Sequence, residues 1–187
     1  MNKRRAAGSW RISLAQARTG RSPVVVYTHP TAANCCGILQ KNVQGVMVEL
    51  GTNTTRTIAS VLFDGNAQRF RCIRWIFSHA GGTMAFLIER FVRHPLLARN
   101  VAPNFPNGVL PELQRFWYDT AQTANAAAMS ELTQVVPLEQ IVFGTDHPYR
   151  TSFDHLQGVR SSGVFTASQL QMIERPSPLR LFPQLRG

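Results

Sequence analysis

Four short apolar runs, rich in β-branched and aromatic residues, recur along the chain without regular polar alternation. They are Val24–Thr28, Ile73–Ser78, Arg115–Asp119 and Ile141–Thr145. Apolar runs of about four to eight residues are typical of strands that are buried on both faces, as in a parallel sheet. The pattern therefore predicts four buried strands.

Helical patterns occupy the intervals between these runs. They run from an Asn53 or Thr54 cap through Leu62, over Thr83–Phe91, over Ala124–Leu132, and from a Thr166 cap to Arg175, where prolines follow. The segment Ala32–Gly51 has no clear period and is predicted to be a long loop. Loops of this length in compact domains are usually functional.

The alternation of strands and helices predicts the fold class. Such a pattern forms a parallel α/β sheet, and an eight-stranded barrel of this type typically needs about 250 residues. The chain has 187 residues and only four strand runs. We therefore expect an α/β domain equal to half of a TIM-type (β/α)8 barrel, with about four parallel strands and flanking helices.

The first 21 residues differ from the rest in charge. Six of the 20 basic residues and none of the 10 acidic ones lie in Met1–Arg21, so the net charge falls from +10 to +4 over the remainder. Residues 1–21 are predicted to be a basic, disordered arm, and residues 22–187 to be the barrel domain. An organellar targeting segment and a polyanion-binding arm are the alternatives for the arm. Nucleic acid is not an expected partner of the domain.

The composition indicates a globular protein. It is 44% hydrophobic and 16% charged, which is an ordinary balance for a folded domain. No apolar run approaches the roughly 18 residues of a membrane-spanning helix, so no membrane association is expected. Three cysteines, with Cys35 and Cys36 adjacent, do not suit a disulfide framework and favour a cytoplasmic location.

Three residues suited to metal binding stand directly after predicted strands. His29 follows the first strand, His79 the second and Asp146 the fourth. The carboxyl ends of barrel strands share one face, which carries the catalytic groups. Imidazole together with carboxylate suits Zn²⁺, Mn²⁺ or Fe²⁺, whereas Ca²⁺ prefers oxygen ligands alone. We therefore expect these three side chains to converge on one site.

The other three histidines lack such a placement. His147 and His155 are predicted to be loop residues. His94 is predicted to lie in solvent at the end of a helix, where it favours the helix dipole. Candidates for a substrate pocket, each equally compatible with an ordinary surface or core position, are the Ala32–Gly51 loop, Arg56, Trp117 and Arg150.

Two longer motifs carry a resemblance to a known family. The runs Ile76–Thr83 and Ile141–Asp146 resemble the amidohydrolase-related decarboxylases, which include the aminocarboxymuconate-semialdehyde, γ-resorcylate and 6-methylsalicylate decarboxylases. Shorter motifs agree in order and spacing at Thr28–Thr31, Asn53–Thr57 and Tyr118–Ala121. The 6-methylsalicylate branch is the most similar, partly through the adjacent Cys35 and Cys36. The resemblance extends from Val24 to about Leu185.

The resemblance implies a fold, a reaction and roles for the matching residues. The fold is the C-terminal half of the barrel, and the reaction is the metal-dependent, non-oxidative decarboxylation of a small aromatic or unsaturated carboxylate. His29 is implied as a metal ligand, and Asp146 as a ligand that also transfers a proton. His79 is implied as the catalytic acid–base residue. Zinc is the implied ion, with manganese as the alternative.

One part of the family pattern is missing. The family's first strand carries a His-x-His or Glu-x-His pair, and no two of the five histidines here are two residues apart. A truncated, inactive copy is therefore one expectation. Two other functions stay open: a metal-dependent hydrolase of lactones or amides, and a non-catalytic module that binds polyanions through its basic arm. The open sheet edges of a half-barrel also favour pairing with a second copy.

Overall fold

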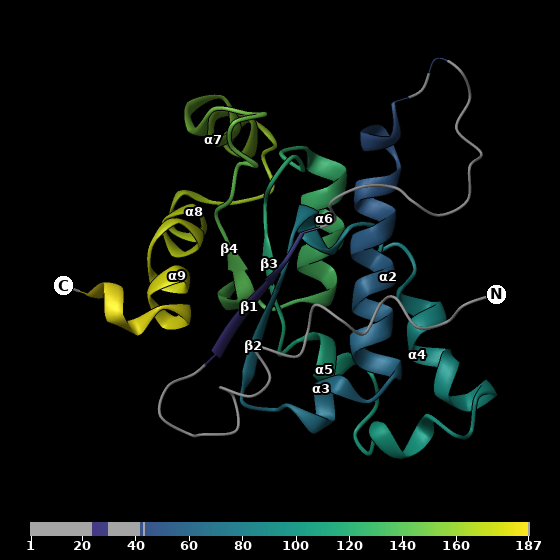
Figure 1. The fold of residues 1–187 in the computed structure, drawn as a ribbon. Coiled ribbons are helices and arrows are strands. Elements are labelled where there is room, and N and C mark those ends of the chain that lie inside the picture. Colours follow the sequence, from purple (N-terminus) through teal and green to yellow (C-terminus); the bar gives the residue numbers. More distant parts are fainter. Residues whose placement is uncertain (1–23, 30–41, 43, 187) are drawn as a thin grey trace.

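One four-stranded sheet forms the centre of the molecule (Figure 1). The computed structural model describes residues 24–29, 42 and 44–186, so the basic arm and the Cys35–Cys36 pair lie outside the described residues. The strands are β1 (Val24–Thr28), β2 (Ile73–Phe77), β3 (Trp117–Asp119) and β4 (Ile141–Val142). All neighbours pair in parallel, in the order β1-β2-β3-β4. The prediction of four parallel strands is confirmed.

Strands β3 and β4 are shorter than expected because their flanking backbone bonds outside the sheet. Before β3, the Arg115 and Phe116 amides donate to the carbonyls of Glu112 and Leu113 at the end of the preceding helix, Leu110–Leu113. After β4, the Phe143 amide donates to the Ile173 carbonyl (3.2 Å). The chain therefore leaves the ladder early, although the apolar run continues.

The register of the sheet brings the carboxyl ends of the strands to one edge. Thr28 of β1 lies opposite Phe77 of β2. Tyr118 of β3 lies opposite Phe77, and Asp119 lies opposite Val142 of β4. Segments that follow the strands therefore begin on the same face of the molecule, where barrel enzymes place their chemistry.

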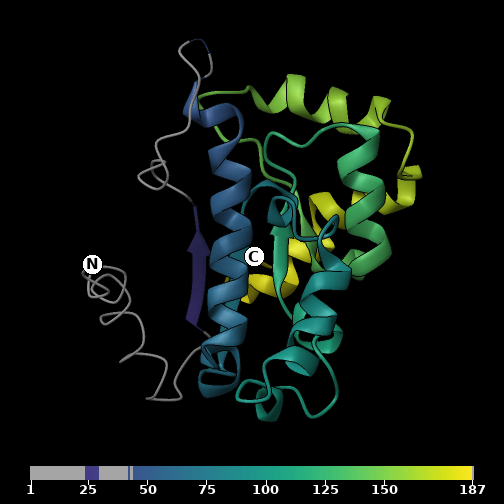
Figure 2. The ribbon, with the colours of Figure 1, turned by 90° about the vertical axis from the view of Figure 1, so that its right-hand side faces the viewer.

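Helices cover the sheet on both sides. They are α2 (Glu49–Phe63), α3 (Asn66–Arg69), α4 (Ile88–Leu97), α5 (Leu110–Leu113), α6 (Ala126–Val135), α7 (Ser152–Ser161), α8 (Ala167–Glu174) and α9 (Pro176–Leu181). Helix α2 runs alongside β1 (Figure 2). Within the described residues, no helix has both the length and the apolar character to cross a membrane.

The two faces of the sheet pack in different hydrophobic clusters, since neighbouring strand residues point to opposite faces. The main cluster contains Phe77 and Tyr118 together with buried residues of α2 and α6. A smaller cluster on the other face joins Ile76, Trp117, Val142 and Leu181 of α9. Trp117, a candidate for the pocket, is therefore a core residue.

Helix α2 begins at Glu49, earlier than the predicted Asn53 or Thr54 cap. The threonines of this segment bond back into the helix: Thr54 Oγ1 donates to the Leu50 carbonyl (3.1 Å) and Thr57 Oγ1 to the Asn53 carbonyl (2.9 Å). Threonine side chains can satisfy such i−4 carbonyls inside a helix as well as cap its start. The cap prediction was wrong for this reason, and part of the predicted loop is helical.

Helix α4 begins at Ile88 and not at Thr83. Gly82 has φ +66° and ψ −128°, and the Thr83 amide donates to Thr55 Oγ1 (2.8 Å) on α2. The segment after His79 therefore forms turns that are hydrogen-bonded to α2, and the helix starts only after them. Helix α4 then continues through Pro95 to Leu97.

The caps of the later helices follow their sequence signals. Asn125 caps α6 by accepting from the Ala128 amide (3.0 Å), so this helix starts two residues after the predicted Ala124. Thr166 and Gln169 form a capping box at α8, as the Thr166 cap predicts. Pro176 follows the end of α8, as predicted, and also begins α9. Proline is tolerated in the first turn of a helix.

Candidate metal centre

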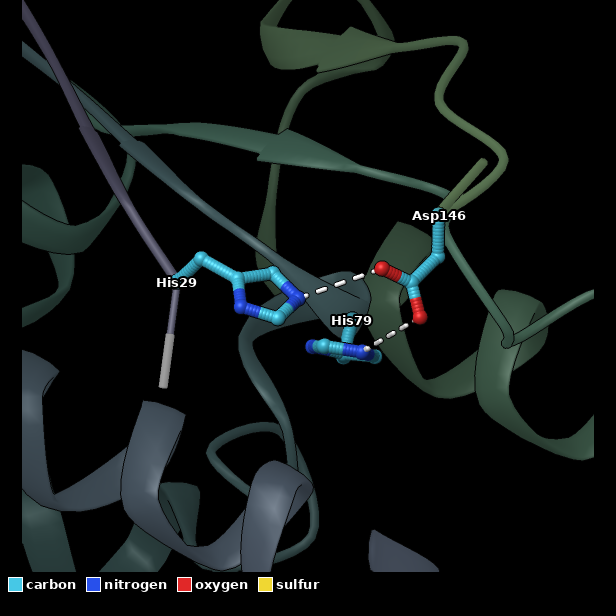
Figure 3. A group of neighbouring side chains, drawn as sticks. All are labelled: His29, His79 and Asp146. Atoms are coloured by element: carbon cyan, nitrogen blue, oxygen red, sulfur yellow. Dashed lines mark hydrogen bonds and ion pairs between the residues drawn. The ribbon is translucent and has the colours of Figure 1, made fainter. Parts of the chain in front are cut away.

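His29, His79 and Asp146 come together at the carboxyl edge of the sheet (Figure 3). His29 Nε2 lies 3.2 Å from Asp146 Oδ1, and His79 Nε2 lies 3.8 Å from Asp146 Oδ2. The two imidazole rings are 5.1 Å apart between centroids. One ligand atom of each residue lies within 4.8 Å of the others. The convergence predicted from the strand ends is therefore present in the structure.

His79 is the most buried member of this group. Its residue is 6% exposed, and its Nε2 is buried without a hydrogen-bond partner. Burial lowers the pKa of His79, although the carboxylates of Asp119 and Asp146 oppose the shift. A neutral imidazole with a free ring nitrogen at the centre of the group is the state that a metal ion or a proton-transfer role requires.

The other ring nitrogen of His79 has a partner. His79 Nδ1 lies 2.9 Å from Ser78 Oγ, which lies 3.3 Å from Thr54 Oγ1 on α2. A proton on Nδ1 can be donated to Ser78, and this tautomer leaves the lone pair on Nε2. Such a bond at the outer nitrogen fixes the tautomer and the ring orientation of metal-binding histidines.

Positive φ angles are concentrated at the site. Among the described residues, the non-glycine positions with positive φ are His79 (55°), Ala80 (52°), Gln122 (56°) and Asp146 (66°). His79, Gln122 and Asp146 all line the same cavity. Each such residue costs on the order of 1–3 kcal/mol, and strain of this kind clusters at functional sites.

A cavity of about 800 Å³ opens beside the three residues. Val46, Met47, Val48 and Tyr149 are apolar or aromatic lining residues that are largely exposed at its rim. The described part of the Ala32–Gly51 segment therefore contributes to the pocket, as predicted. Among the described lining residues there is no lysine or arginine.

The two arginines predicted as pocket candidates do not line the cavity. Arg56 lies on α2 and donates to Asn53 Oδ1 (2.7 Å), with Glu49 Oε2 at 3.5 Å. Arg150 Nη2 donates to the Asp154 carbonyl (3.3 Å). Both guanidinium groups bond to neighbouring residues in the sequence and do not line the cavity. They therefore do not pair with a negative charge bound there.

Asp119, at the end of β3, was not singled out from the sequence. It is 4% exposed, and burial raises the pKa of its carboxyl although hydrogen bonds oppose the shift. Its Oδ1 accepts from the His79 amide (2.9 Å), and its Oδ2 accepts from the Tyr27 hydroxyl (2.7 Å). Its position as the last residue of an apolar run was the available signal, and it is close to that of His29, which directly follows such a run.

The positions predicted for the other three histidines were correct in some cases and wrong in others. His147 is an exposed loop residue, as predicted. His155 is fully buried on α7, with Nε2 3.1 Å from Thr120 Oγ1, so its loop prediction was wrong. His94 lies in the last turn of α4, as predicted, but its half-buried ring packs edge-on against Phe63 (4.5 Å) and is not fully exposed to solvent.

Comparison with known proteins places the chain in a family. A family model described as amidohydrolase matches residues 20–182. The chain belongs to the amidohydrolase family, which confirms the resemblance found in the motifs around His79 and Asp146.

Its curated relatives include several decarboxylases. The 6-methylsalicylic acid decarboxylase of Aspergillus aculeatus is 30% identical over 135 residues, which cover 71% of this chain and 41% of the relative. The 6-methylsalicylic acid decarboxylase of Penicillium expansum is 26% identical over 173 residues, covering 89% and 52%. The chain spans about half the length of the curated relatives it matches.

Solved structures agree in fold. The 5-carboxyvanillate decarboxylase of Novosphingobium aromaticivorans, complexed with manganese, has a TM-score of 0.75 at 13% identity, over 90% of this chain and 49% of that one. The 2,6-dihydroxybenzoate decarboxylase of Rhizobium has a TM-score of 0.66 at 16% identity, over 87% and 52%. These neighbours are amidohydrolase TIM barrels, and this chain matches about half of each, which confirms the predicted fold class.

Proposed function

We propose that this chain supplies half of the active site of a metal-dependent decarboxylase, which releases CO₂ from a small aromatic carboxylate. The observation that carries the proposal is the convergence of His29, His79 and Asp146 around an unpartnered, buried imidazole nitrogen. Membership of the amidohydrolase family and the decarboxylase relatives support it.

The residues present fit a divalent ion. His29 and Asp146 are the proposed ligands, and their 3.2 Å separation suits two donors that each lie about 2.0–2.2 Å from one ion. Zinc is the ion we propose first, since imidazole nitrogen favours it. Manganese is the alternative, because a structural neighbour is complexed with it.

The charges around the cavity support a role for a metal ion. No described lining residue is a cation, so protein side chains there do not offset the charge of a bound carboxylate. A divalent ion, when bound, supplies that positive charge and acts as a Lewis acid toward the carboxylate. The apolar rim formed by Val46, Met47, Val48 and Tyr149 suits the aromatic ring of such a substrate.

Decarboxylation requires that a proton reach the carbon that bears the carboxylate, before the bond to CO₂ breaks. We assign this proton transfer to His79: its unpartnered Nε2 first takes up a proton from solvent, and the imidazolium then donates that proton to the carbon and returns to the neutral form that burial favours. Asp146, whose Oδ2 lies 3.8 Å from that nitrogen, is a carboxylate with which His79 can exchange the proton.

The test is CO₂ release by the full chain with Zn²⁺ or Mn²⁺, using 6-methylsalicylate and 2,6-dihydroxybenzoate as substrates. We expect metal-dependent release that falls by about 10²–10⁴-fold in His79→Gln, the usual contribution of an acid–base residue. His147→Gln, at an exposed histidine, is the control and should leave the rate unchanged. Hydrolysis of lactones or amides without CO₂ release would contradict the decarboxylase proposal and support the hydrolase.

We also propose a cytoplasmic location, because the chain has an odd number of cysteines, and self-association, because a half-barrel sheet is expected to have open edges. A mass of about twice 20.9 kDa by light scattering would support a dimer. A monomer at all concentrations would contradict self-association without affecting the metal site.

A further inference from the structure

One buried carboxylate joins the strand ends that carry the metal-binding residues. Asp119 ends β3, which lies between β2 and β4 in the sheet. Its Oδ1 accepts from two backbone amides, those of His79 (2.9 Å) and Ala121 (3.0 Å). Its Oδ2 accepts from the Tyr27 hydroxyl (2.7 Å) on β1. Asp119 therefore links β1 and β2 through side-chain bonds that the sheet ladder does not supply.

The bond to the His79 amide acts where the backbone is strained. His79 and Ala80 have φ angles of 55° and 52°, which L-residues rarely adopt. A hydrogen bond from an amide to a carboxylate is stronger than one between neutral groups. Asp119 is placed to hold His79 in this conformation, which directs Nε2 toward Asp146.

The bond to Tyr27 acts on the other histidine. Tyr27 lies two residues before His29, and their rings stack with centroids 6.3 Å apart. The Tyr27 hydroxyl can donate to Asp119 only while the end of β1 keeps its place relative to β3. The same carboxylate thus constrains both the His29 and the His79 segments.

Gly144, two residues before Asp146, lets the segment after β4 approach this carboxylate. A Cβ atom at Gly144 would lie 3.0 Å from the Asp119 Cβ and 3.1 Å from its Cγ, closer than most real contacts. The absence of a side chain there allows the Asp146 segment to pass directly over Asp119. The segments that carry His29, His79 and Asp146 therefore all lie against Asp119.

We propose that Asp119 is a positioning residue of the metal centre, which holds His29 and His79 in the places where they meet Asp146. The inference rests on the proposed function. Asp119 does not itself bind the ion, because it is 4% exposed and both of its oxygens already accept hydrogen bonds. It acts through Tyr27 and the His79 amide.

Tyr27→Phe tests the link to β1 with a matched control. Tyr27 is half exposed, whereas Tyr118 is fully buried, and the Tyr118 hydroxyl donates to a backbone carbonyl, that of Leu113 (2.9 Å), within the main core. Tyr118→Phe therefore removes a tyrosine hydroxyl and its hydrogen bond without removing a hydrogen bond to Asp119. Both variants keep their aromatic rings, and Asp119→Asn is added as a near-isosteric change at the carboxylate.

Two readouts on the full chain separate positioning from general stability. Residues that support metal ligands typically contribute about 10–100-fold to metal affinity. We expect Tyr27→Phe and Asp119→Asn to weaken Co²⁺ binding by about this factor and to change the visible spectrum of the bound ion. Tyr118→Phe should lower only the melting temperature. Wild-type affinity and an unchanged spectrum in both site variants would overturn the inference.

A metal-free readout keeps the inference distinct from the proposed function. The backbone amide proton of His79 should resonate far downfield in the NMR spectrum of the wild-type chain, because it donates to a carboxylate. It should move upfield in Asp119→Asn. If the wild-type chain binds no Co²⁺, the metal centre is wrong, and an unmoved His79 amide in Asp119→Asn separately overturns the role of Asp119.

Discussion

Two buried histidines, His79 and His155, have lowered pKa values, although only His79 lines the cavity. Burial lowers the pKa of both His79 and His155. His79 has an unpartnered Nε2 at the site, whereas His155 Nε2 lies against Thr120 Oγ1, whose hydroxyl donates to the Gly144 carbonyl (3.0 Å). His155 thus supports the connection between β3 and the Asp146 segment and does not contact the cavity.

The neutral state of His155 makes the stability of the fold sensitive to acid. Burial is the main cause of its lowered pKa, and the nearby Arg150 adds to it. As the pH falls below about 6.5, the unfolded chain binds a proton at this residue before the folded chain does. The free energy of unfolding should therefore fall, by at most about 1.4 kcal/mol per pH unit for this one group.

His155→Gln isolates this contribution, because the glutamine amide can still donate to Thr120 and does not titrate. We expect the free energy of unfolding, measured with urea between pH 7.5 and pH 5, to fall less steeply in the variant than in the wild type. His79 is present in both proteins, so its own titration cancels in the difference. Equal slopes would show that His155 is not held neutral.

At the scale of elements, helix α2 and the segment after β2 are in unusually close contact. A Cβ atom at Gly82 would lie 1.9 Å from the Gly51 carbonyl oxygen and 2.7 Å from Thr55 Oγ1. Thr55 Oγ1 also accepts from the Thr83 amide (2.8 Å). The helix therefore positions the segment that begins with His79.

Gly82→Ala should be severely destabilising, since Gly82 combines a positive φ of 66° with backbone contact. Gly163→Ala is the control, because Gly163 also has a positive φ (69°) but nothing within 4 Å of the added methyl group. We expect the control to lose about 1–2 kcal/mol of unfolding free energy, and Gly82→Ala to lose about 1–3 kcal/mol more from overpacking. Similar losses in the two variants, measured by urea unfolding, would show that the close contact is absent.

The sequence predicted the sheet better than the helices. The strands are uninterrupted apolar runs, and burial on both faces of a parallel sheet produces that pattern directly. The start of α2 was misplaced because threonine hydroxyls serve equally as caps and as internal hydrogen-bond donors. Helix α7 was missed because its polar sequence, Ser152–Ser161, contains few apolar positions to show a helical period.

The candidate site was predictable in part, because most of its residues follow strands of the parallel sheet. His29, His79 and Asp146 follow strands, and the topology of a parallel sheet brings such positions together. Asp119 occupies an equivalent position, but its role depends on hydrogen bonds to Tyr27 and to the His79 amide. Partners so distant in sequence are set by the folded structure and leave no local pattern.

At the scale of the whole molecule, the hydrophobic core and the candidate site lie at different parts of the sheet. Both of its faces bury hydrophobic clusters, and its carboxyl edge carries the cavity and the polar residues. The chain matches about half of each amidohydrolase barrel compared with it. We therefore propose that this half holds a divalent ion at His29 and Asp146.

Equilibrium dialysis of the full chain against Zn²⁺ or Mn²⁺, followed by elemental analysis, tests that claim most directly. We predict one ion per chain in the wild type and in His147→Ala, which changes an exposed histidine outside the group. We predict loss of the ion in His29→Ala and in Asp146→Ala. A folded wild-type chain without a bound ion, or equal binding in all four proteins, would contradict the account.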